Sequence, residues 1–299
     1  LRRSQEAPSM KFSYAQAMCD PSFHLPMAIE AEKAGYHGMV VPDNLGYPGP
    51  SKVKYPYTAD GDNSFLEGKP FIEPFILISA MAAVTSTLRF GTLVVKLPVR
   101  QPYIVAKQAT SLAVISNNRF SFGVGLSPWP EDFAVTGQDW KSRGKRMDEM
   151  IDILRGLETG EFFEFHSEHY DIQPIKMCPT PPEPIPILIG GHAEPALKRA
   201  ARTGDGWMHA GGAPAELPSY IARLHELRKE YGRDHLPFEI HAISPDAFTV
   251  DGVHRLQDMG ITNVIVGFAN AYRKEADTQT LEQKRDLLKG FADKVISKV

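Results

Sequence analysis

Residues 185–203 read Ile-Pro-Ile-Leu-Ile-Gly-Gly-His-Ala-Glu-Pro-Ala-Leu-Lys-Arg-Ala-Ala-Arg-Thr: a short apolar run, a glycine pair and a helical pattern. An uninterrupted apolar run of this kind is typical of a parallel strand that is buried on both faces. The glycines predict a tight turn, and the residues after them predict a helix over 195–203. The stretch therefore indicates one strand–turn–helix unit of an α/β protein.

The same unit recurs along the whole chain. The expected strands cover residues 10–17, 38–41, 88–95, 119–126, 185–190, 206–210, 238–243 and 263–268. The expected helices cover residues 26–35, 71–84, 101–115, 142–157, 195–203, 216–231, 252–259 and 278–299. Eight strands, each followed by a helix, are what a TIM (β/α)8 barrel requires, whereas a doubly wound open sheet usually has fewer repeats. We therefore predict an α/β protein with a TIM barrel.

Two longer segments interrupt this spacing. Residues 44–70 follow the second strand, are rich in Gly, Pro, Tyr and Asp, and are expected at the C-terminal face of the barrel, where active-site loops lie. Residues 160–184 precede the fifth strand and belong to the opposite face, with a hairpin expected around 162–172. Residues 1–9 are expected to be a leader or a disordered extension, and residues 10–299 a single barrel domain.

Composition and charge argue against several classes of protein. Lys and Arg number 33 against 36 Asp and Glu, which gives a net charge of −3 and no basic stripe for nucleic acid or a membrane surface. The apolar stretch Phe75–Val84 is shorter than the roughly 20 residues that span a bilayer. Cys19 and Cys178 provide neither a disulfide framework nor a zinc module, so we expect a reduced, cytoplasmic protein.

Polar and glycine residues at the expected C-terminal ends of the strands form the candidate site. Asp43 and Asn44 end the second strand, a position that favours ligand contact over an Asx-type turn. Gly190, Gly191 and His192 lie between the fifth strand and its helix, where backbone N–H groups suit a phosphate, although a plain tight turn explains the glycines equally well. Neither GxGxxG nor GxxxxGK[ST] occurs, so dinucleotide and P-loop interpretations have no direct support.

Other reactive side chains fit no complete catalytic pattern. Ser127 lies outside a GxSxG motif, and topology offers His209 at the end of the sixth strand as a partner. His166 and His169 fall in the expected hairpin on the wrong face of the barrel, so we expect no metal site. Trp129, between two prolines, suits either a pocket wall or the barrel rim. Four basic residues near the expected mouth suit either an anionic ligand or surface ion pairs: Lys96, Arg100, Arg143 and Arg146.

Five stretches occur in an order that is shared with a known family. They are Glu32–Asp43, Phe90–Pro102 with 106–108, Arg119–Gly125, Arg143–Glu149, and Ile187–Gly191 with Ala200–Trp207. Together, over roughly residues 10–268, they resemble the luciferase-like monooxygenase family, particularly its deazaflavin-dependent branch. The resemblance implies a TIM barrel that binds coenzyme F420, or alternatively FMN, at the C-terminal ends of its strands.

The resemblance also implies where the cofactor lies. The tricyclic ring would lie over the third strand, where family members often have a non-proline cis peptide, here at Leu93–Val94, with Asp43 and Asn44 beside the ring. The strand-four turn would line the opposite wall, and the turn after the fifth strand would hold the phosphate. The implied cofactor contacts are Asp43, Leu93, Val94, Gly125, Ser127, Gly190, Gly191 and His192.

The chain departs from the sugar-phosphate dehydrogenases of this branch at two positions. They have a histidine at the position of Asn44 and a glutamate after the strand-four glycine, where Leu126 and Ser127 stand here. Asparagine cannot act as a general base and leucine cannot donate a proton. We therefore predict F420-dependent hydride transfer to or from a small organic substrate covered by residues 44–70. The alternatives are an FMN-dependent monooxygenase and a non-catalytic subunit of the same fold.

A homodimer is expected from the same resemblance, and neither nucleic acid nor a membrane is expected as a partner. The expected helix over 71–84 has more apolar surface than one barrel-facing stripe needs. We predict that it packs against a second copy through Phe75, Ile76, Ile78, Met81 and Val84.

Overall fold

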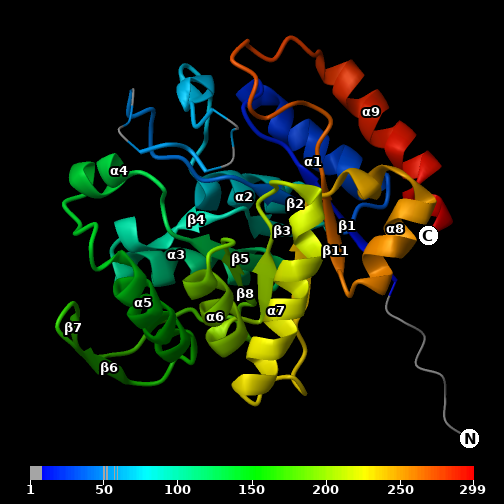
Figure 1. Ribbon diagram of the computed structural model, residues 1–299. Coiled ribbons are helices and arrows are strands. Elements are labelled where there is room, and N and C mark those ends of the chain that lie inside the picture. The colour runs from blue at the N-terminus through cyan, green and yellow to red at the C-terminus, as the bar shows by residue number, and fades with distance from the viewer. Residues whose placement is uncertain (1–8, 50, 52, 57, 59) are drawn as a thin grey trace, which may run out of the picture.

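Parallel strands close into a barrel in the computed structural model, which describes residues 9–49, 51, 53–56, 58 and 60–299 (Figure 1). The barrel strands are β1 (Lys11–Ala15), β2 (Gly38–Val41), β3 (Arg89–Thr92) continued by β4 (Val95–Lys96), β5 (Phe120–Gly125), β8 (Ile187–Gly190), β9 (Gly206–Met208), β10 (Glu239–Ala242) and β11 (Asn263–Val266). Pairing of β1 with β11 and of β3 with β5 completes the ring. The predicted TIM barrel is confirmed. The expected leader over residues 1–9 lies, except for Ser9, outside the described residues.

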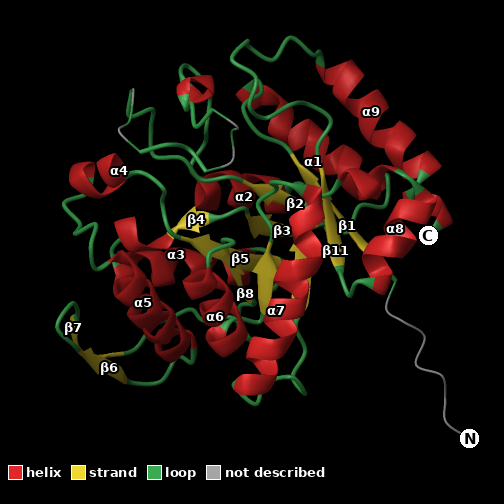
Figure 2. Ribbon diagram, viewed as in Figure 1, coloured by secondary structure: helices red, strands yellow, loops and turns green. Residues whose placement is uncertain are grey.

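Helices surround the barrel and follow its strands (Figure 2). They are α1 (His24–Lys33), α2 (Pro74–Ala83), α3 (Pro102–Ile115), α4 (Pro130–Val135), α5 (Arg143–Glu158), α6 (Glu194–Thr203), α7 (Leu217–Glu230), α8 (Val250–Asp258) and α9 (Leu281–Lys294). Short 3-10 helices cover Pro21–Phe23, Ser64–Leu66, Leu97–Val99, Pro214–Glu216, Pro245–Phe248 and Ile296–Lys298. The predicted helices are all present. Among the α-helices of the described residues, α4 alone was not expected, because six residues are too few to show a helical period.

The third barrel strand is interrupted where the sequence analysis expected one continuous strand over 88–95. β3 pairs with β2 and β5, whereas β4 pairs only with β5, with Lys96 opposite Gly125. The peptide bond between Leu93 and Val94, in the interruption, is cis, as predicted. Both side chains are half-buried and pack against the interior of the barrel.

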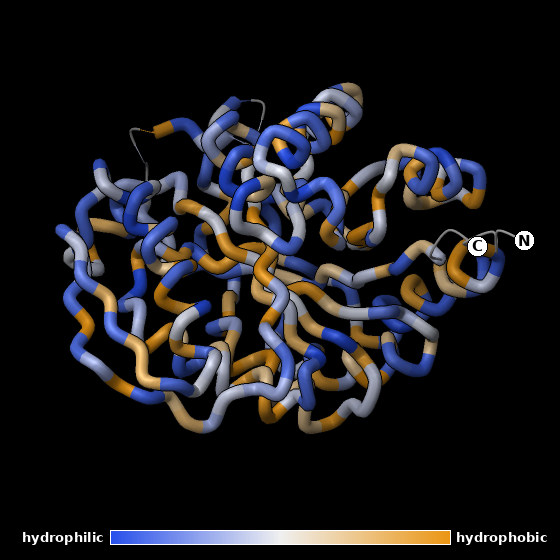
Figure 3. The backbone as a smooth tube through the Cα atoms, turned by 90° about the horizontal axis from the view of Figure 1, so that it is seen from below, coloured by the Kyte–Doolittle hydropathy of each residue, from blue (hydrophilic) through white to orange (hydrophobic). Residues whose placement is uncertain are grey.

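Two apolar cores stabilise the barrel. An inner core fills the ring with alternate residues from four strands, Val40, Leu188, Met208 and Ile265. The residues between them point outward and join a larger core beneath the helices, as Ile187 and Ile189 do in β8. Hydrophobic and hydrophilic residues are interspersed along the backbone (Figure 3). Strands buried on both faces in this way explain the uninterrupted apolar runs in the sequence.

The two insertions lie at opposite ends of the barrel (Figure 1). Residues 44–70 lie on the side where β2 ends. The predicted hairpin is present as β6 (Phe163–His166) and β7 (Asp171–Ile175), which pair antiparallel. His166 in this hairpin is exposed and contacts Asp171, and the described residues contain no cluster of His, Cys, Asp and Glu that suits a metal ion. Within the same residues, no helix has the length and apolarity to cross a bilayer.

Most of the apolar surface of α2 is buried within the chain. Phe75, Ile78 and Met81 are at most 5% exposed, because α2 packs between α1, α3 and β3. The expectation that these three residues contact a second copy is therefore wrong. Ile76 and Val84, which are 67% and 40% exposed, remain free to do so.

Candidate active site

The C-terminal ends of the strands bring the predicted site residues to one end of the barrel. Asp43 and Asn44 follow β2, Lys96 ends β4, and Ser127 lies two residues after β5. Gly190 ends β8, the next strand around the ring. In TIM barrels this end carries the active site, so the side chains here are the candidates for ligand contact.

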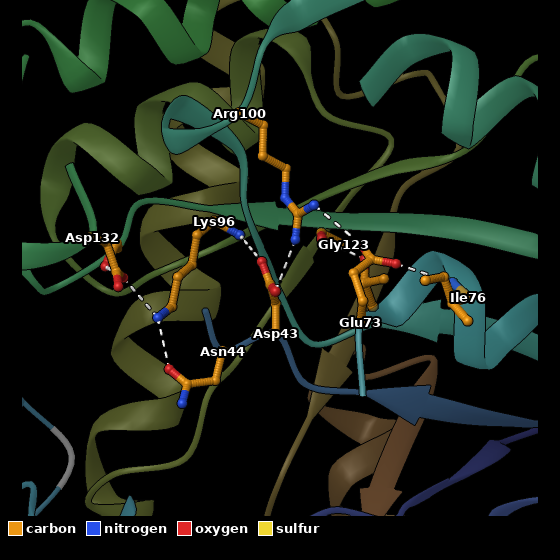
Figure 4. A network of polar contacts seen from close by, with 10 residues as sticks. Asp43, Asn44, Glu73, Ile76, Lys96, Arg100, Gly123 and Asp132 are labelled. Atoms are coloured by element: carbon orange, nitrogen blue, oxygen red, sulfur yellow. Dashed lines mark hydrogen bonds and ion pairs between the residues drawn. The ribbon is translucent and has the colours of Figure 1, made fainter. Parts of the chain in front are cut away.

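The Asp43 carboxylate links the end of the second barrel strand to the third strand by two hydrogen bonds, which we call the Asp43 clamp. Its Oδ2 accepts a hydrogen bond from the backbone N–H of Lys96 at 2.9 Å, and its Oδ1 accepts one from Arg100 Nη2 at 2.9 Å (Figure 4). Arg100 also donates to Glu73, just before α2, at 3.1 Å. The Asp43 side chain is only 1% exposed. Its carboxylate thus holds the segment that follows the cis peptide.

Lys96 lies at the centre of a second polar network. Its Nζ donates to Asn44 Oδ1 at 3.0 Å and to Asp132 Oδ2, on α4, at 2.7 Å (Figure 4). The Ser127 hydroxyl donates to the same Asp132 oxygen and accepts from the backbone N–H of Trp129. Lys96, Ser127 and Asp132 are each at most 7% exposed. A buried ammonium needs such a carboxylate partner, because an unpaired charge in this position would be strongly destabilising.

The suggested pairing of Ser127 with His209 is not formed. His209 follows β9 and its Nδ1 contacts the backbone carbonyl of Ile243 at 3.2 Å. Its ring stacks on His192, while the Ser127 hydroxyl belongs to the Asp132 network. The interpretation of Ser127 as a nucleophile activated by His209 is therefore wrong, because β9 places the histidine on another side of the barrel mouth.

Two glycines make room for Val94 at the centre of the strand ends. A Cβ on Gly125 would lie 2.7 Å from Val94 Cγ2, and a Cβ on Gly190 would lie 2.9 Å from Val94 Cγ1. Such distances are well inside van der Waals contact. The side chain next to the cis peptide thus occupies the space between β5 and β8, and only glycine fits on both neighbouring strands.

His192 is part of an aromatic stack beside the glycine turn. Its ring lies 4.7 Å from the His209 ring and 4.9 Å from the Tyr220 ring, centroid to centroid. Burial lowers the pKa of His192, and burial together with the nearby His192 lowers the pKa of His209 to about 4. Trp207 Nε1 donates to the carbonyl of Gly191 at 2.8 Å and so supports the turn. Burial therefore disfavours the protonated form of both imidazoles.

Three glycines with positive φ values follow the strands β8 and β9 at the barrel mouth. Gly191 after β8 and Gly211 and Gly212 after β9 have φ values of +119°, +93° and +111°. A Cβ on Gly211 would meet nothing within 4 Å, and one on Gly212 would approach only the His192 ring, at 3.7 Å. The N-terminus of α6 has no side-chain cap. Open backbone near an uncapped helix N-terminus suits an anionic group.

We call Gly190, Gly191, His192, Gly211 and Gly212 the glycine cradle. The sequence analysis missed the last two of these residues. Gly211 and Gly212 follow the sixth barrel strand just as Gly190 and Gly191 end the fifth, and this repetition was the available signal. Glu194, in the first turn of α6, carries the opposite charge to the helix N-terminus, but it is paired with Arg223 at 2.8 Å. The acidic residue therefore does not cancel the anion-binding character of the turn.

The remaining basic candidates have structural partners. Arg143 stacks on Trp140, with its guanidinium carbon 3.7 Å from the ring centroid. Arg146 is 5% exposed and donates to the backbone carbonyl of Pro98 and to Gln138. These contacts tie α5 to the segment before it and to the turn after β4. Arg146 is therefore used within the fold, whereas Arg143 is half-buried against Trp140.

Residues 44–70 pack over the strand ends through aromatic contacts. Trp129 is only 2% exposed and stacks on Tyr55, with centroids 5.3 Å apart and an interplanar angle of 12°. Phe65 meets Tyr272, from the segment after β11, edge to face at 5.3 Å. Asp62 pairs with Lys274 of that segment at 2.6 Å. The long insertion is thus attached both to the segment before α4 and to the segment after β11.

A cavity of about 660 Å³ opens elsewhere, beside α5 and residues 181–184. Arg155 in its lining pairs with Glu158 at 2.7 Å and also with Asp205. These charges satisfy one another, and Asp205 lies at the N-terminal end of β9, away from the C-terminal strand ends, so we place the candidate site at the barrel mouth instead.

The sequence is similar to proteins of one known family. A family model for luciferase-like monooxygenases matches residues 8–250. An uncharacterized protein of Mycobacterium tuberculosis is 57% identical over 290 residues, which cover 97% of this chain and 100% of that protein. An F420-dependent glucose-6-phosphate dehydrogenase of Amycolatopsis mediterranei is 30% identical over 155 residues, which cover 50% of this chain and 46% of that protein.

Solved structures share the same fold. An F420-dependent secondary alcohol dehydrogenase, in complex with an F420–acetone adduct, matches with a TM-score of 0.74 at 16% identity, over 97% of this chain and 99% of that chain. A coenzyme F420-dependent tetrahydromethanopterin reductase from Methanopyrus kandleri matches with a TM-score of 0.73 at 14% identity, over the same shares of the two chains. At these identities the likeness concerns the fold.

Proposed function

Because the chain belongs to the luciferase-like monooxygenase family and is an oxidoreductase, we propose that it transfers hydride between coenzyme F420 and a small organic substrate. The observation that carries the proposal is the open backbone of Gly211 and Gly212, which lies close to His192 just before the uncapped N-terminus of α6. F420 also appears in the names of a distant relative and of two structural neighbours.

The residues present fit this cofactor. Gly190, Gly191 and His192, with Gly211 and Gly212 after β9, would hold the phosphate, since the backbone of Gly211 and Gly212 is open where a Cβ would otherwise project. Leu93 and Val94 would lie beneath the ring, with Asn44 at its edge. Gly125 and Ser127 would complete the opposite wall, and Asp43 would act through its clamp on the backbone. When bound, the cofactor supplies or accepts one hydride, and the substrate exchanges one proton with solvent.

The protein contributes position and exclusion of water. The Asp43 clamp fixes β4 against the end of β2, so that the surface next to the cis peptide is rigid. The aromatic contacts of Tyr55 and Phe65 hold residues 44–70 over the site and would limit access of water to the substrate. Orientation of this kind and a dry pocket are what a hydride-transferring protein provides, while the cofactor carries the chemistry.

Fluorescence-quenching titrations with F420 and with FMN test the proposal. We expect F420 to bind with a Kd in the micromolar range or below, and FMN to bind much more weakly. Gly211→Ala should weaken F420 binding about tenfold, because its methyl group enters the open space of the cradle. The matched control is Gly232→Ala, at a glycine that also has a positive φ but lies after α7.

Two other outcomes of these titrations would favour a different function. Tight binding of FMN alone would favour the FMN-dependent monooxygenase, a reaction class that the family includes. Binding of neither cofactor would favour the non-catalytic subunit, in which the barrel has kept only its architecture.

A homodimer is part of the same proposal. Ile76 on α2 and Ile104 and Ile115 on α3 are 67%, 56% and 61% exposed, and the two helices pack side by side. Large apolar side chains gathered on neighbouring helices are typical of a surface that another protein covers. A second copy of this chain is the partner that we propose.

A further inference from the structure

Hydrogen bonds hold both the backbone and the ammonium group of Lys96, so its position beside the site is fixed. Its backbone N–H donates to Asp43, and its Nζ donates to Asp132 at 2.7 Å. Asp132 is held in turn by the Ser127 hydroxyl. The loop after β2, the strand β4, the loop after β5 and α4 thus meet at one buried ammonium. A side chain with so many constraints can orient a neighbour with little loss of entropy.

That neighbour is Asn44, whose carboxamide has a defined orientation. Lys96 Nζ has only donors, so the group that faces it at 3.0 Å must be the Asn44 oxygen and not the amide nitrogen. Figure 4 shows the Nδ2 of Asn44 on the far side of the carboxamide from Lys96. In the part of the chain that the structure describes, Asn44 is half-buried and its Nδ2 makes no hydrogen bond. An oriented donor is therefore available at the barrel mouth.

We propose that the Asn44 amide donates a hydrogen bond to the oxygen of an uncharged carbonyl substrate, or of the corresponding alcohol, and that Lys96 is the residue that positions it. The proposal rests on the proposed function, since it concerns the substrate of the same site. During reduction the carbonyl carbon accepts a hydride from the reduced cofactor, which is left oxidised, and the oxygen takes a proton from water. Asn44 stabilises the negative charge that develops on that oxygen without giving up a proton.

The charges around this donor favour an uncharged substrate. The positive charge of Lys96 is paired with Asp132, and that of Arg100 with Asp43 and Glu73. No net positive charge is left in this group to bind a phosphate ester beside the ring. The substrate class is therefore a neutral ketone or aldehyde and its alcohol, in contrast to a sugar phosphate.

The central variant is Asn44→Asp, which keeps an oxygen toward Lys96 but replaces the donor with an acceptor. With reduced F420 and a panel of neutral ketones and aldehydes, we expect kcat to fall 10²–10³-fold, the range for loss of one oxyanion donor. F420 should still bind, as fluorescence quenching measures, since the change leaves the turn that holds the phosphate intact, and kcat is therefore compared at saturating F420. Asn117→Asp, which adds the same charge to an exposed residue after α3, is the control and should leave kcat unchanged.

The positioning role of Lys96 needs a separate measurement. Lys96→Met combined with Asp132→Asn removes both buried charges together and releases the Asn44 carboxamide. We expect kcat to fall about tenfold or more while the KM for F420 stays constant. In an Asn44→Ala background the same pair should have no further effect on kcat, because the amide that Lys96 orients is absent. A merely structural role of Lys96 would lower kcat in both backgrounds.

The possible failures are distinguishable. If F420 does not bind to the wild-type protein, the proposed function fails. If F420 binds but the protein turns over none of the neutral carbonyls, or prefers glucose 6-phosphate, the substrate inference is wrong and cofactor binding stands. Full activity of Asn44→Asp would also overturn it.

Discussion

The steric relation between Gly190 and Val94 makes a sharp prediction about stability. In Gly190→Ala the new Cβ would lie 2.9 Å from Val94 Cγ1 and 3.2 Å from Cγ2. Carbon atoms pack at about 3.5–4.0 Å, so Val94 must move by roughly 0.5–1 Å. Overpacking of this size costs about 1–3 kcal/mol of unfolding free energy. The φ of Gly190 is not positive, so backbone strain adds nothing.

A double-mutant cycle isolates the contact. Val94→Ala removes both Cγ atoms, and the added methyl of Gly190→Ala then has room. We expect the double variant to be more stable than the sum of the single effects predicts, with a coupling of about 1–3 kcal/mol. Urea denaturation of the four proteins, followed by circular dichroism, measures it. Gly91→Ala is the control, because its Cβ would meet Val40 Cγ1 at an ordinary 3.5 Å.

The cycle has two outcomes that would refute the reasoning. Unfolding free energies that add within about 0.5 kcal/mol would show that Val94 does not fill the space above Gly190. A Gly190→Ala protein as stable as wild type would show that the strand ends are too loose to support a cofactor ring.

Two further predictions concern pH and assembly. Burial lowers the pKa values of His37 and His209 to about 4, whereas the pKa of a histidine in an unfolded chain is about 6.5. Between pH 6.5 and 4 the unfolded state therefore binds more protons than the folded state, and acid should reduce the free energy of unfolding. The loss of unfolding free energy should reach at most about 1.4 kcal/mol per pH unit for each histidine. Urea denaturation at pH 7 and pH 5 measures it, and equal stability at the two pH values would argue against burial of both neutral rings. Ile104→Asp places a charge at an exposed apolar residue of α3, the helix that packs against α2, and should convert the proposed dimer into a monomer by light scattering. A wild-type monomer would refute the dimer itself.

The barrel was predictable from the sequence because each of its strands and helices shows a hydrophobic pattern within its own residues. Apolar runs such as Ile187–Ile189 repeat eight times with helical patterns between them, and each pattern reflects which faces of one element must be buried. The cis peptide bond at Leu93–Val94 was expected from the family resemblance and is present, whereas the interruption of the strand at that point was not expected. Local patterns also have limits: α4 is too short to show a period, and nothing in the residues of α2 distinguishes the buried Ile78 from the exposed Ile76.

The contacts at the site were not predictable, because they join residues that are far apart in the chain. Asp43 binds Arg100, 57 positions away, and Lys96 binds Asn44, 52 positions away, only because β2 and β3 are neighbours in the closed ring. From the sequence alone, Asp43 and Asn44 were an equivalent pair of polar residues. The sequence by itself determined which residues alternate between strand and helix, since that depends on the burial of each face. Closure of the barrel then decided that one carboxylate is a clamp and that the neighbouring amide is free to meet a ligand.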